Sequence, residues 1–269
     1  MKHLPNLLTL GNLFCGCIAI AYIFSAQPYL SMNLADHSGM PSWQWVYGAY
    51  QLYLGSFFIL IAAVFDLFDG LTARALKVFS PIGKDLDSLA DVVSFGVAPA
   101  AILFKLLWDI LSAEKNAFDI NMLGMAPAFL LACFAALRLA KFNITSDSQK
   151  SYFIGLPTPA AGLFVASFPL VMWFSPAIVS HYFGIIILGK WKIYVLIAIL
   201  CWLMVSKVKF LKLMPAKRSI GGMWPQLLIV LFTIAGIFVI GFAVLPLAFV
   251  LYVLLSFIYK HPETIKDNG

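Results

Sequence analysis

The stretch FDLFDGLTARALKVFSPIGKDLDSLADVVSFG, which runs from Phe65 to Gly96, concentrates acidic residues beside apolar runs. It holds five of the chain's 12 acidic residues: Asp66, Asp69, Asp85, Asp87 and Asp91. The chain as a whole is 62% hydrophobic and only 11% charged, whereas soluble domains are about 25% charged. Because carboxylates in a poorly hydrated region are costly unless they are compensated, the stretch indicates a functional site.

Apolar segments recur along nearly the whole chain, with the length of about 18–20 residues that crossing a bilayer requires. They are continuously apolar rather than alternating, which favours transmembrane helices over a β-barrel. We therefore predict an all-α polytopic membrane protein that forms a single domain over residues 1–269. The eight predicted helices span residues 4–26, 46–77, 86–108, 122–143, 157–175, 190–210, 225–241 and 244–260.

Lysine and arginine are unevenly divided between the two sides of this predicted bundle. One side holds 14 of the 18 basic residues, and the other holds Lys105, Lys115, Lys190 and Lys192. By the positive-inside rule the richer side is cytoplasmic, so we expect both termini and the acidic stretch on the cytoplasmic face of the inner cell membrane. The net charge of +6 comes from basic residues in short loops beside membrane spans, so membrane topology explains most of them. A minority can bind anionic lipid headgroups, and nucleic acid is not expected as a partner.

Polar residues at the start of the first predicted helix are spaced for one face. Asn6, Thr9 and Asn12 lie three residues apart in the segment LPNLLTLGN, which places them on one side of a helix. We expect this helix to be a functional part of the membrane domain rather than a cleaved leader. Contact with neighbouring helices is one explanation for these side chains, and contact with a ligand is another.

The first half of the acidic stretch has the spacing of a helix face. Asp66, Asp69, Gly70 and Ala73 fall at positions i, i+3, i+4 and i+7, so two carboxylates and two small residues share one side. Pro81 is expected to end this helix and to let the chain turn back. The small residues would let a bulky ligand approach the backbone closely.

The second half repeats the arrangement, because Gly83, Asp87, Asp91 and Ser94 are spaced by four, four and three residues. A short turn between antiparallel helices would bring the two acidic faces together. A divalent cation with oxygen ligands would then balance the charge. Helix capping or solvation at the interface is the alternative explanation for any single aspartate, and Asp85 falls on another face with no predicted role.

Eight residues of the stretch together match the pattern D-x2-D-G-x2-A-R-x8-G-x3-D-x3-D. This pattern resembles the signature of the CDP-alcohol phosphotransferases, which transfer a phosphatidyl or related group from a CDP-linked donor to an alcohol and release CMP. The resemblance implies a pair of Mg²⁺ or Mn²⁺ ions held by Asp66, Asp69, Asp87 and Asp91, with Asp91 also serving as general base. The implied nucleotide contacts are Asn6, Thr9, Asp66, Gly70, Ala73, Arg74 and Gly83.

Motifs outside this pattern bear on the acceptor alcohol. They are NLFCG (Asn12 to Gly16), LADVVSFGVAPA (Leu89 to Ala100), RLAKFN (Arg138 to Asn143) and FIGLPTPAA (Phe153 to Ala161). They resemble segments of the bacterial and archaeal membrane-bound phosphatidylserine synthases, which implies CDP-diacylglycerol and L-serine as substrates and a homodimer as the assembly. Ser94, Arg138 and Lys141 are candidates for binding the acceptor or the lipid phosphate, and Lys141 stands where an arginine is expected.

The same resemblance implies a six-helix catalytic core within about residues 1–210, with the helices at about 225–260 as additions. Two other functions remain open at this point. The same chemistry can use another acceptor, such as glycerol 3-phosphate, inositol phosphate or choline, and intramembrane acids can instead mark the ion path of a transporter. For Arg138 and Lys141, snorkelling of basic side chains at a helix end is the alternative explanation.

Overall fold

The computed structural model describes residues 4–26, 29–33, 42–46, 49–76, 81–112, 122–145, 152–211 and 224–258. Almost every residue in these ranges belongs to a helix. The α-helices are α1 (Leu4–Ser25), α2 (Ala49–Leu76), α3 (Pro81–Asp91), α4 (Ala98–Ser112), α5 (Met122–Met125), α6 (Leu130–Thr145), α7 (Thr158–Phe174), α8 (Ala177–Ile187), α9 (Lys190–Val205), α10 (Trp224–Ile240) and α11 (Val244–Ile258). The all-α architecture predicted from the apolar runs is confirmed.

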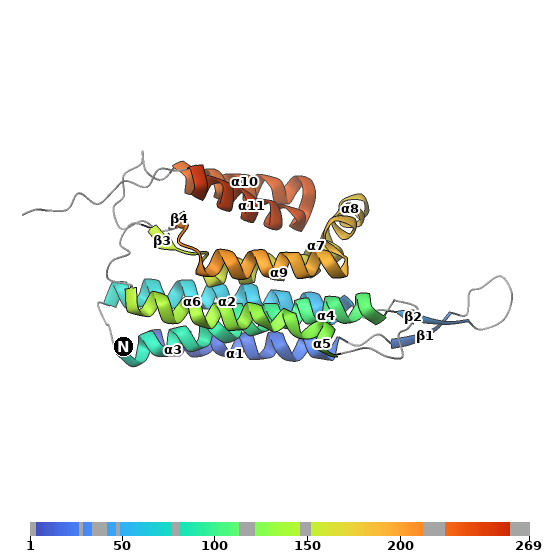
Figure 1. Cartoon of the computed structure of the whole chain (residues 1–269), viewed down its shortest axis with the longest axis horizontal. Coiled ribbons are helices and arrows are strands. Elements are labelled where there is room, and N and C mark those ends of the chain that lie inside the picture. The colour runs from blue at the N-terminus through green and yellow to red at the C-terminus, as the bar shows by residue number, and fades with distance from the viewer. Residues whose placement is uncertain are drawn as a thin grey trace, which may run out of the picture.

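The long helices lie side by side along the longest axis of the molecule (Figure 1). α1 and α3 form one edge of the view, and α10 and α11 form the opposite edge. The helices α2 and α4 contact α1, α6 packs against α9, and α7 and α9 lie between this layer and the α10–α11 pair. The bundle is therefore layered, and its last two helices pack on the outside of the others.

The predicted count of eight membrane-spanning helices is not confirmed. Among the described residues, five helical stretches are long and apolar enough to cross a membrane, at Leu4–Ser25, Leu52–Leu76, Ile82–Ser112, Met122–Ile144 and Trp224–Ile258. A sixth is added if α8 and α9, which are bent by 77° at their junction, count as one span. The predicted count is not confirmed because α7 has only 17 residues, and because α10 and α11 belong to one apolar stretch that turns at Gly241, where φ is 63°.

Two helix boundaries were predicted wrongly because short strands take the place of helix. The second helix begins at Ala49 rather than 46, since β2 (Ser42–Val46) pairs antiparallel with β1 (Tyr29–Asn33). The sixth ends at Val205 rather than 210, since β4 (Lys209–Leu211) pairs antiparallel with β3 (Tyr152–Ile154). Helix α8 was not predicted, and Lys77, Lys115 and the predicted helix end at 259–260 lie outside the described residues.

The acidic stretch forms two consecutive helices, as its spacing predicted. Asp66 and Asp69 lie on α2, and Pro81 is the first residue of α3, a position where proline is well tolerated because the missing amide hydrogen has no intrahelical partner. α3 continues without interruption through a short π-helix, η1 (Val92–Val97), into α4. This continuous segment extends beyond the predicted range of 86–108 at both ends.

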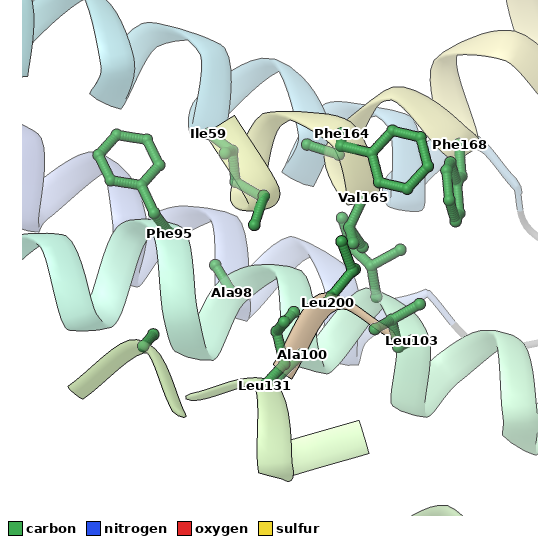
Figure 2. Close-up of a cluster of buried hydrophobic side chains, with 14 of the residues drawn as sticks. Ile59, Phe95, Ala98, Ala100, Leu103, Leu131, Phe164, Val165, Phe168 and Leu200 are labelled. Carbon is green, nitrogen blue, oxygen red and sulfur yellow. The ribbon is translucent and has the colours of Figure 1, made fainter. Parts of the chain in front are cut away.

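The core lies where η1 and α4 meet α2, α6, α7 and α9. Its buried side chains include Ile59, Phe95, Ala98, Ala100, Leu103, Leu131, Phe164, Val165, Phe168 and Leu200 (Figure 2). At its centre α7 approaches η1 so closely that a Cβ atom on Gly162 would lie 2.9 Å from backbone atoms of Phe95. Because lipid tails are as apolar as this core, close packing rather than hydrophobic burial holds such helices together.

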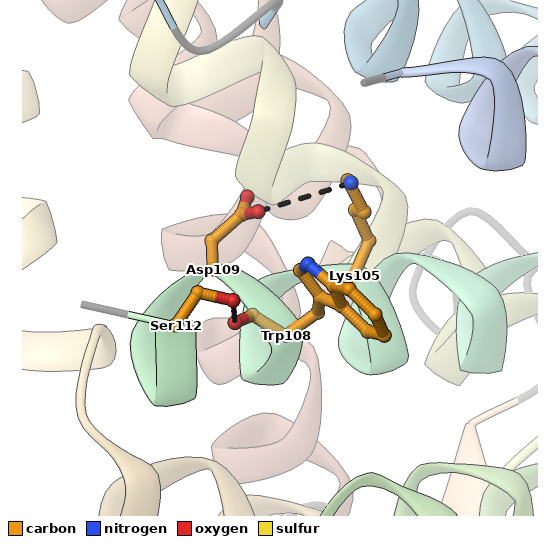
Figure 3. Close-up of polar contacts among 4 residues, drawn as sticks. All are labelled: Lys105, Trp108, Asp109 and Ser112. Carbon is orange, nitrogen blue, oxygen red and sulfur yellow. Dashed lines mark hydrogen bonds and ion pairs between the residues drawn. The ribbon is translucent and has the colours of Figure 1, made fainter. Parts of the chain in front are cut away.

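A partly buried ion pair lies in the later half of α4, away from the acidic stretch. The Lys105 ammonium is 3.9 Å from a carboxylate oxygen of Asp109, one helical turn later, and lies 6.0 Å from the centroid of the Trp108 ring (Figure 3). Ser112 donates a hydrogen bond of 2.6 Å to the Trp108 carbonyl oxygen. Opposite charges are thus matched within a single helix at this end of the bundle.

Candidate active site

Three carboxylates of the acidic stretch converge between α2 and α3. Asp66, Asp69 and Asp87 each offer an oxygen, and these three oxygens all lie within 4.8 Å of one another. Asp69 is buried, and Asp66 and Asp87 are partly exposed. One oxygen of Asp87 is buried without a hydrogen-bond partner among the described residues. A group of carboxylates with an unsatisfied buried oxygen fits a divalent cation, which takes oxygen ligands.

Asp91 lies close to this group but is not a member of it. It lies one helical turn after Asp87 on α3 and is 6% exposed. It still interacts electrostatically with Asp66 and Asp87. Its Oδ1 accepts a hydrogen bond of 3.3 Å from Nδ2 of Asn12 on α1. The predicted convergence of four aspartates is therefore seen as three carboxylates within common reach and a fourth beside them.

α1 contributes polar side chains to the acidic group. The Thr9 hydroxyl lies 2.8 Å from Oδ2 of Asp69 and 3.0 Å from the carbonyl oxygen of Pro5, so its proton is shared between two acceptors. Asn12 binds Asp91, while Asn6 lies partly buried earlier on the same helix. Sequence reasoning placed these residues on one face but missed the Asn12 to Asp91 contact, because it joins residues 79 positions apart.

Small residues leave the backbone of α2 open beside the carboxylates. A Cβ atom on Gly70 would meet only the end of the Arg74 side chain, at 3.9 Å. Arg74 is exposed, and its Nε donates a hydrogen bond of 2.9 Å to the Gly70 carbonyl oxygen. Ala73 and Gly83 are partly exposed. The surface next to the acidic group can therefore admit a bulky ligand, as the residue types predicted.

Basic residues line a pocket on α6. The pocket has a volume of about 280 Å³ and is lined by Arg138, Lys141, Phe142, Ile144, Ile154, Met204, Val205, Ser206 and Lys207. Arg138 is 6% exposed, and its guanidinium lies 5.0 Å from the centroid of the Phe142 ring and 5.6 Å from that of Phe153. Its Nε has no hydrogen-bond partner among the described residues, which leaves a buried donor for an anionic ligand.

This pocket is electrostatically linked to the acidic group, because Arg138 interacts with Asp91. Ser94, in contrast, is completely buried and donates a hydrogen bond of 3.0 Å to the Asn12 carbonyl oxygen. It also packs against Gly16, where a Cβ atom would collide with its hydroxyl. In this structure Ser94 joins η1 to α1, and its proposed contact with an acceptor remains a prediction.

A second contact that sequence reasoning missed joins α3 to α6. Lys84 Nζ donates a hydrogen bond of 2.9 Å to the Asn143 carbonyl oxygen, and Asn143 Nδ2 donates one of 2.8 Å to the Ser88 hydroxyl. Asn143 closes the motif RLAKFN that begins at Arg138. The motif therefore fixes α3, with Asp87 and Asp91, relative to the basic pocket, while Asp85 is exposed on another face of α3.

Comparison with known proteins gives concordant matches. A family model described as CDP-alcohol phosphatidyltransferase matches residues 2–259. A Bacillus subtilis (strain 168) protein named CDP-diacylglycerol--serine O-phosphatidyltransferase is 30% identical over 210 residues, which cover 78% of this chain and 90% of that protein. A protein of the same name from Helicobacter pylori (strain J99) is 32% identical over 162 residues, 60% of this chain and 54% of that protein.

An archaetidylserine synthase from Methanothermobacter thermautotrophicus is 34% identical over 119 residues, which cover 44% of this chain and 46% of the archaeal protein. The chain thus spans about half the length of the Helicobacter and archaeal relatives and nine-tenths of the Bacillus relative.

Proposed function

Because this chain belongs to the CDP-alcohol phosphatidyltransferase family, we propose that it transfers the phosphatidyl group of CDP-diacylglycerol to the hydroxyl of L-serine, giving phosphatidylserine and CMP. The observation that carries this proposal is the group of Asp66, Asp69 and Asp87 beside Asp91 and the Arg138 pocket. It supplies a cation site, a carboxylate base and an anion site next to one another. The names of the relatives support serine as the acceptor.

Asp66, Asp69 and Asp87 would hold a pair of Mg²⁺ or Mn²⁺ ions, with Asp91 completing the ligand set. When bound, these ions neutralise pyrophosphate oxygens and stabilise the leaving CMP. Thr9 orients the Asp69 carboxylate through its hydrogen bond. The open backbone at Gly70 admits the nucleotide, for which Asn6, Thr9, Ala73, Arg74 and Gly83 are the remaining proposed contacts.

Asp91 is the proposed general base. The serine hydroxyl gives its proton to Asp91 while its oxygen forms a bond to the phosphorus that carries diacylglycerol, and the bond from that phosphorus to the oxygen of CMP breaks. Asn12 occupies Oδ1 of Asp91, which holds the carboxylate in place and leaves Oδ2 to accept the proton.

The pocket on α6 is the proposed site for the acceptor's anionic group. Serine carries a carboxylate, and an arginine with an unsatisfied buried donor is well suited to bind it. Lys141 and Lys207 line the same pocket and add positive charge. Choline has no anionic group and would gain nothing from these residues, whereas glycerol 3-phosphate and inositol phosphate would.

The chain is an integral membrane protein, and we place its site and both termini on the cytoplasmic side of the inner membrane because basic residues are concentrated there. The acyl tails of the donor would stay in lipid between helices. A homodimer is the proposed assembly, with a catalytic core within about residues 1–210 and the helices at about 225–260 added to it.

The direct test is CMP release by the purified protein in detergent with CDP-diacylglycerol and Mn²⁺ or Mg²⁺. Serine, glycerol 3-phosphate, inositol phosphate and choline are compared as acceptors, and the lipid product is identified by mass spectrometry. Serine-dependent CMP release with formation of phosphatidylserine is expected. Release with a different acceptor would overturn the choice of serine, and metal-dependent ion flux in vesicles without any CMP release would favour a transporter instead.

A further inference from the structure

The last helix holds the edge of the β3–β4 ribbon through two side chains. The Tyr252 hydroxyl donates a hydrogen bond of 3.1 Å to the carbonyl oxygen of Leu211, and the Leu211 amide donates one of 3.3 Å to the Ser256 hydroxyl. Ser256 in turn donates to the Tyr252 carbonyl oxygen at 2.8 Å. Tyr252 and Ser256 are both buried. Side chains of α11 thus satisfy both backbone groups of Leu211, as a neighbouring strand would.

The ribbon held in this way forms part of the basic pocket. Ile154 of β3 lines the pocket, and the Phe153 ring lies over the Arg138 guanidinium. The residues from Met204 to Lys207, which lead into β4, form another part of the wall. The amide of Gly155, directly after β3, donates a hydrogen bond to the Val208 carbonyl oxygen. Gly155 adopts a φ of 78°. A Cβ atom at this position would collide with the Met204 carbonyl oxygen.

α11 does not line the pocket, but it packs against the β4 strand of the ribbon. The Tyr252 ring stacks on the ring of Phe210 in β4, with centroids 5.9 Å apart. Phe210 is completely buried. The helix pair that lies outside the expected catalytic core therefore contacts the ribbon through Phe210 and Leu211, behind the part of the ribbon that lines the candidate acceptor pocket.

We propose that Tyr252 and Ser256 are positioning residues for the acceptor pocket: by holding Leu211, they fix the ribbon that places Phe153 against Arg138 and closes the pocket beside α6. This inference rests on the proposed function, because it assumes that Arg138 binds the serine carboxylate. It gives the α10–α11 pair a specific role in acceptor binding. Neither residue is placed in contact with substrate.

The test compares Tyr252→Phe, Ser256→Ala and the conservative Ser256→Thr in the full-length protein. Tyr252→Phe keeps the ring stacked on Phe210 and removes only the hydroxyl. Tyr194→Phe is a matched control, because the Tyr194 hydroxyl also bonds a backbone carbonyl, that of Gly124, at a distant site. Ser175→Ala is a second control, because Ser175 accepts a hydrogen bond from Ala243 at the turn between α10 and α11.

CMP release is measured against serine concentration and, separately, against CDP-diacylglycerol concentration. The hydrogen bonds from Tyr252 and Ser256 to the backbone of Leu211 form a clamp. Loss of one hydrogen bond from this clamp is expected to raise KM for serine by roughly three- to tenfold, while KM for CDP-diacylglycerol stays as in the wild type. Ser256→Thr, which keeps a hydroxyl, is expected to restore most of the affinity for serine. Neither control is expected to change KM for serine.

Several results would overturn the inference. If the wild type releases CMP with serine but both clamp variants keep its KM for serine, Tyr252 and Ser256 do not position the pocket. The same conclusion holds if the clamp variants raise KM for serine and KM for CDP-diacylglycerol equally. It also holds if the control variants raise KM for serine as much as the clamp variants do, because a general loosening of the fold would have these effects. If the wild type itself shows no serine-dependent release, the proposed function fails first, independently of the clamp variants.

Discussion

The molecule buries charge in two regions and treats it in opposite ways. On α4, Lys105 faces Asp109 one turn away, so each charge has a partner of opposite sign. Between α2 and α3, Asp66, Asp69 and Asp87 share one small volume, and no ion pair to any of them is found among the residues that the structure describes. The charge of one site is balanced within the chain, although Oδ1 of Asp109 has no hydrogen bond among the described residues, whereas the other site requires positive charge from outside.

This difference separates a structural use of charge from a functional one. An ion pair whose charges balance each other can stabilise or orient a helix, but it offers little net charge to a ligand. A cluster of like charges destabilises the folded protein in a poorly hydrated site unless it binds cations or protons. The presence of such a cluster therefore indicates that cations or protons bind there. Variants in the two regions should therefore behave in opposite ways.

The largest effect is expected for Asp69→Asn. Loss of this carboxylate removes a ligand from the proposed cation site, so CMP release should fall to background. The apoprotein should be no less stable, because one of three repelling charges is gone. CMP release and thermal unfolding in detergent are measured together. Asp85→Asn is the control, since Asp85 is exposed on another face of α3, and equal losses in both variants would contradict the proposed cation site.

Asp91→Asn should be the next most damaging change. Removal of a general base lowers the rate by about 10²–10⁴-fold, mainly in kcat, while the three-carboxylate group remains intact. Asparagine keeps the size of the side chain and can still pair with Asn12. The measurement is kcat at saturating Mn²⁺, with the Mn²⁺ affinity determined alongside it, because Asp91 is also a proposed ligand of the cations. A normal kcat in this variant would exclude Asp91 as the base, whatever happens to metal affinity.

Added metal should stabilise the wild type against unfolding. An ion that binds only the folded protein adds about 2.7 kcal/mol when its concentration is 100 times Kd. The unfolding midpoint is measured with a chelator and then with Mn²⁺. Lys105→Met should show the same gain as the wild type, and Asp69→Asn should lose most of it. A gain that persists in Asp69→Asn would indicate that the ion binds elsewhere.

Lys105→Met should destabilise the fold and spare the chemistry. Leaving Asp109 without its partner should cost about 1–3 kcal/mol, the range for an unsatisfied buried polar group; partial exposure of Asp109 keeps the cost near the lower end. The double variant Lys105→Met with Asp109→Leu should recover most of this loss, because replacing both partners with apolar residues is often nearly neutral. A drop in kcat of the folded protein would contradict a purely structural role.

The sequence predicted those parts of the site that depend on spacing within one helix. Asp66 and Asp69 share a face of α2 because residues three apart do so in any helix, and Pro81 begins α3 because proline suits a first turn. The contact of Asn12 with Asp91 and the clamp on Leu211 were not predicted. They join elements that are far apart along the chain, so they depend on how whole helices pack rather than on local periodicity.

The misplaced helix boundaries have a similar cause. Residues up to 210 read as one apolar run, yet Lys209–Leu211 pairs with Tyr152–Ile154, because a partner strand lies nearby in the folded chain. The composition of a segment decides whether it can cross a membrane, but pairing with a distant segment can override its helical pattern. Hydropathy also did not reveal α8, which joins α9 at a bend of 77°.

The smallest effect is expected for Lys141→Arg, which changes the basic pocket and leaves the acidic cluster as it is. Arginine presents a planar fork that can bind a carboxylate through two parallel hydrogen bonds, whereas lysine is a point charge. Because Arg138 already supplies a guanidinium to the pocket, the change should lower KM for serine by only about two- to threefold, within the range of a single added hydrogen bond. Lys141→Met should raise KM for serine, since it removes positive charge from the pocket wall. Equal KM values in all three proteins would mean that Lys141 faces lipid headgroups rather than the acceptor, leaving Arg138 as the residue that recognises its carboxylate.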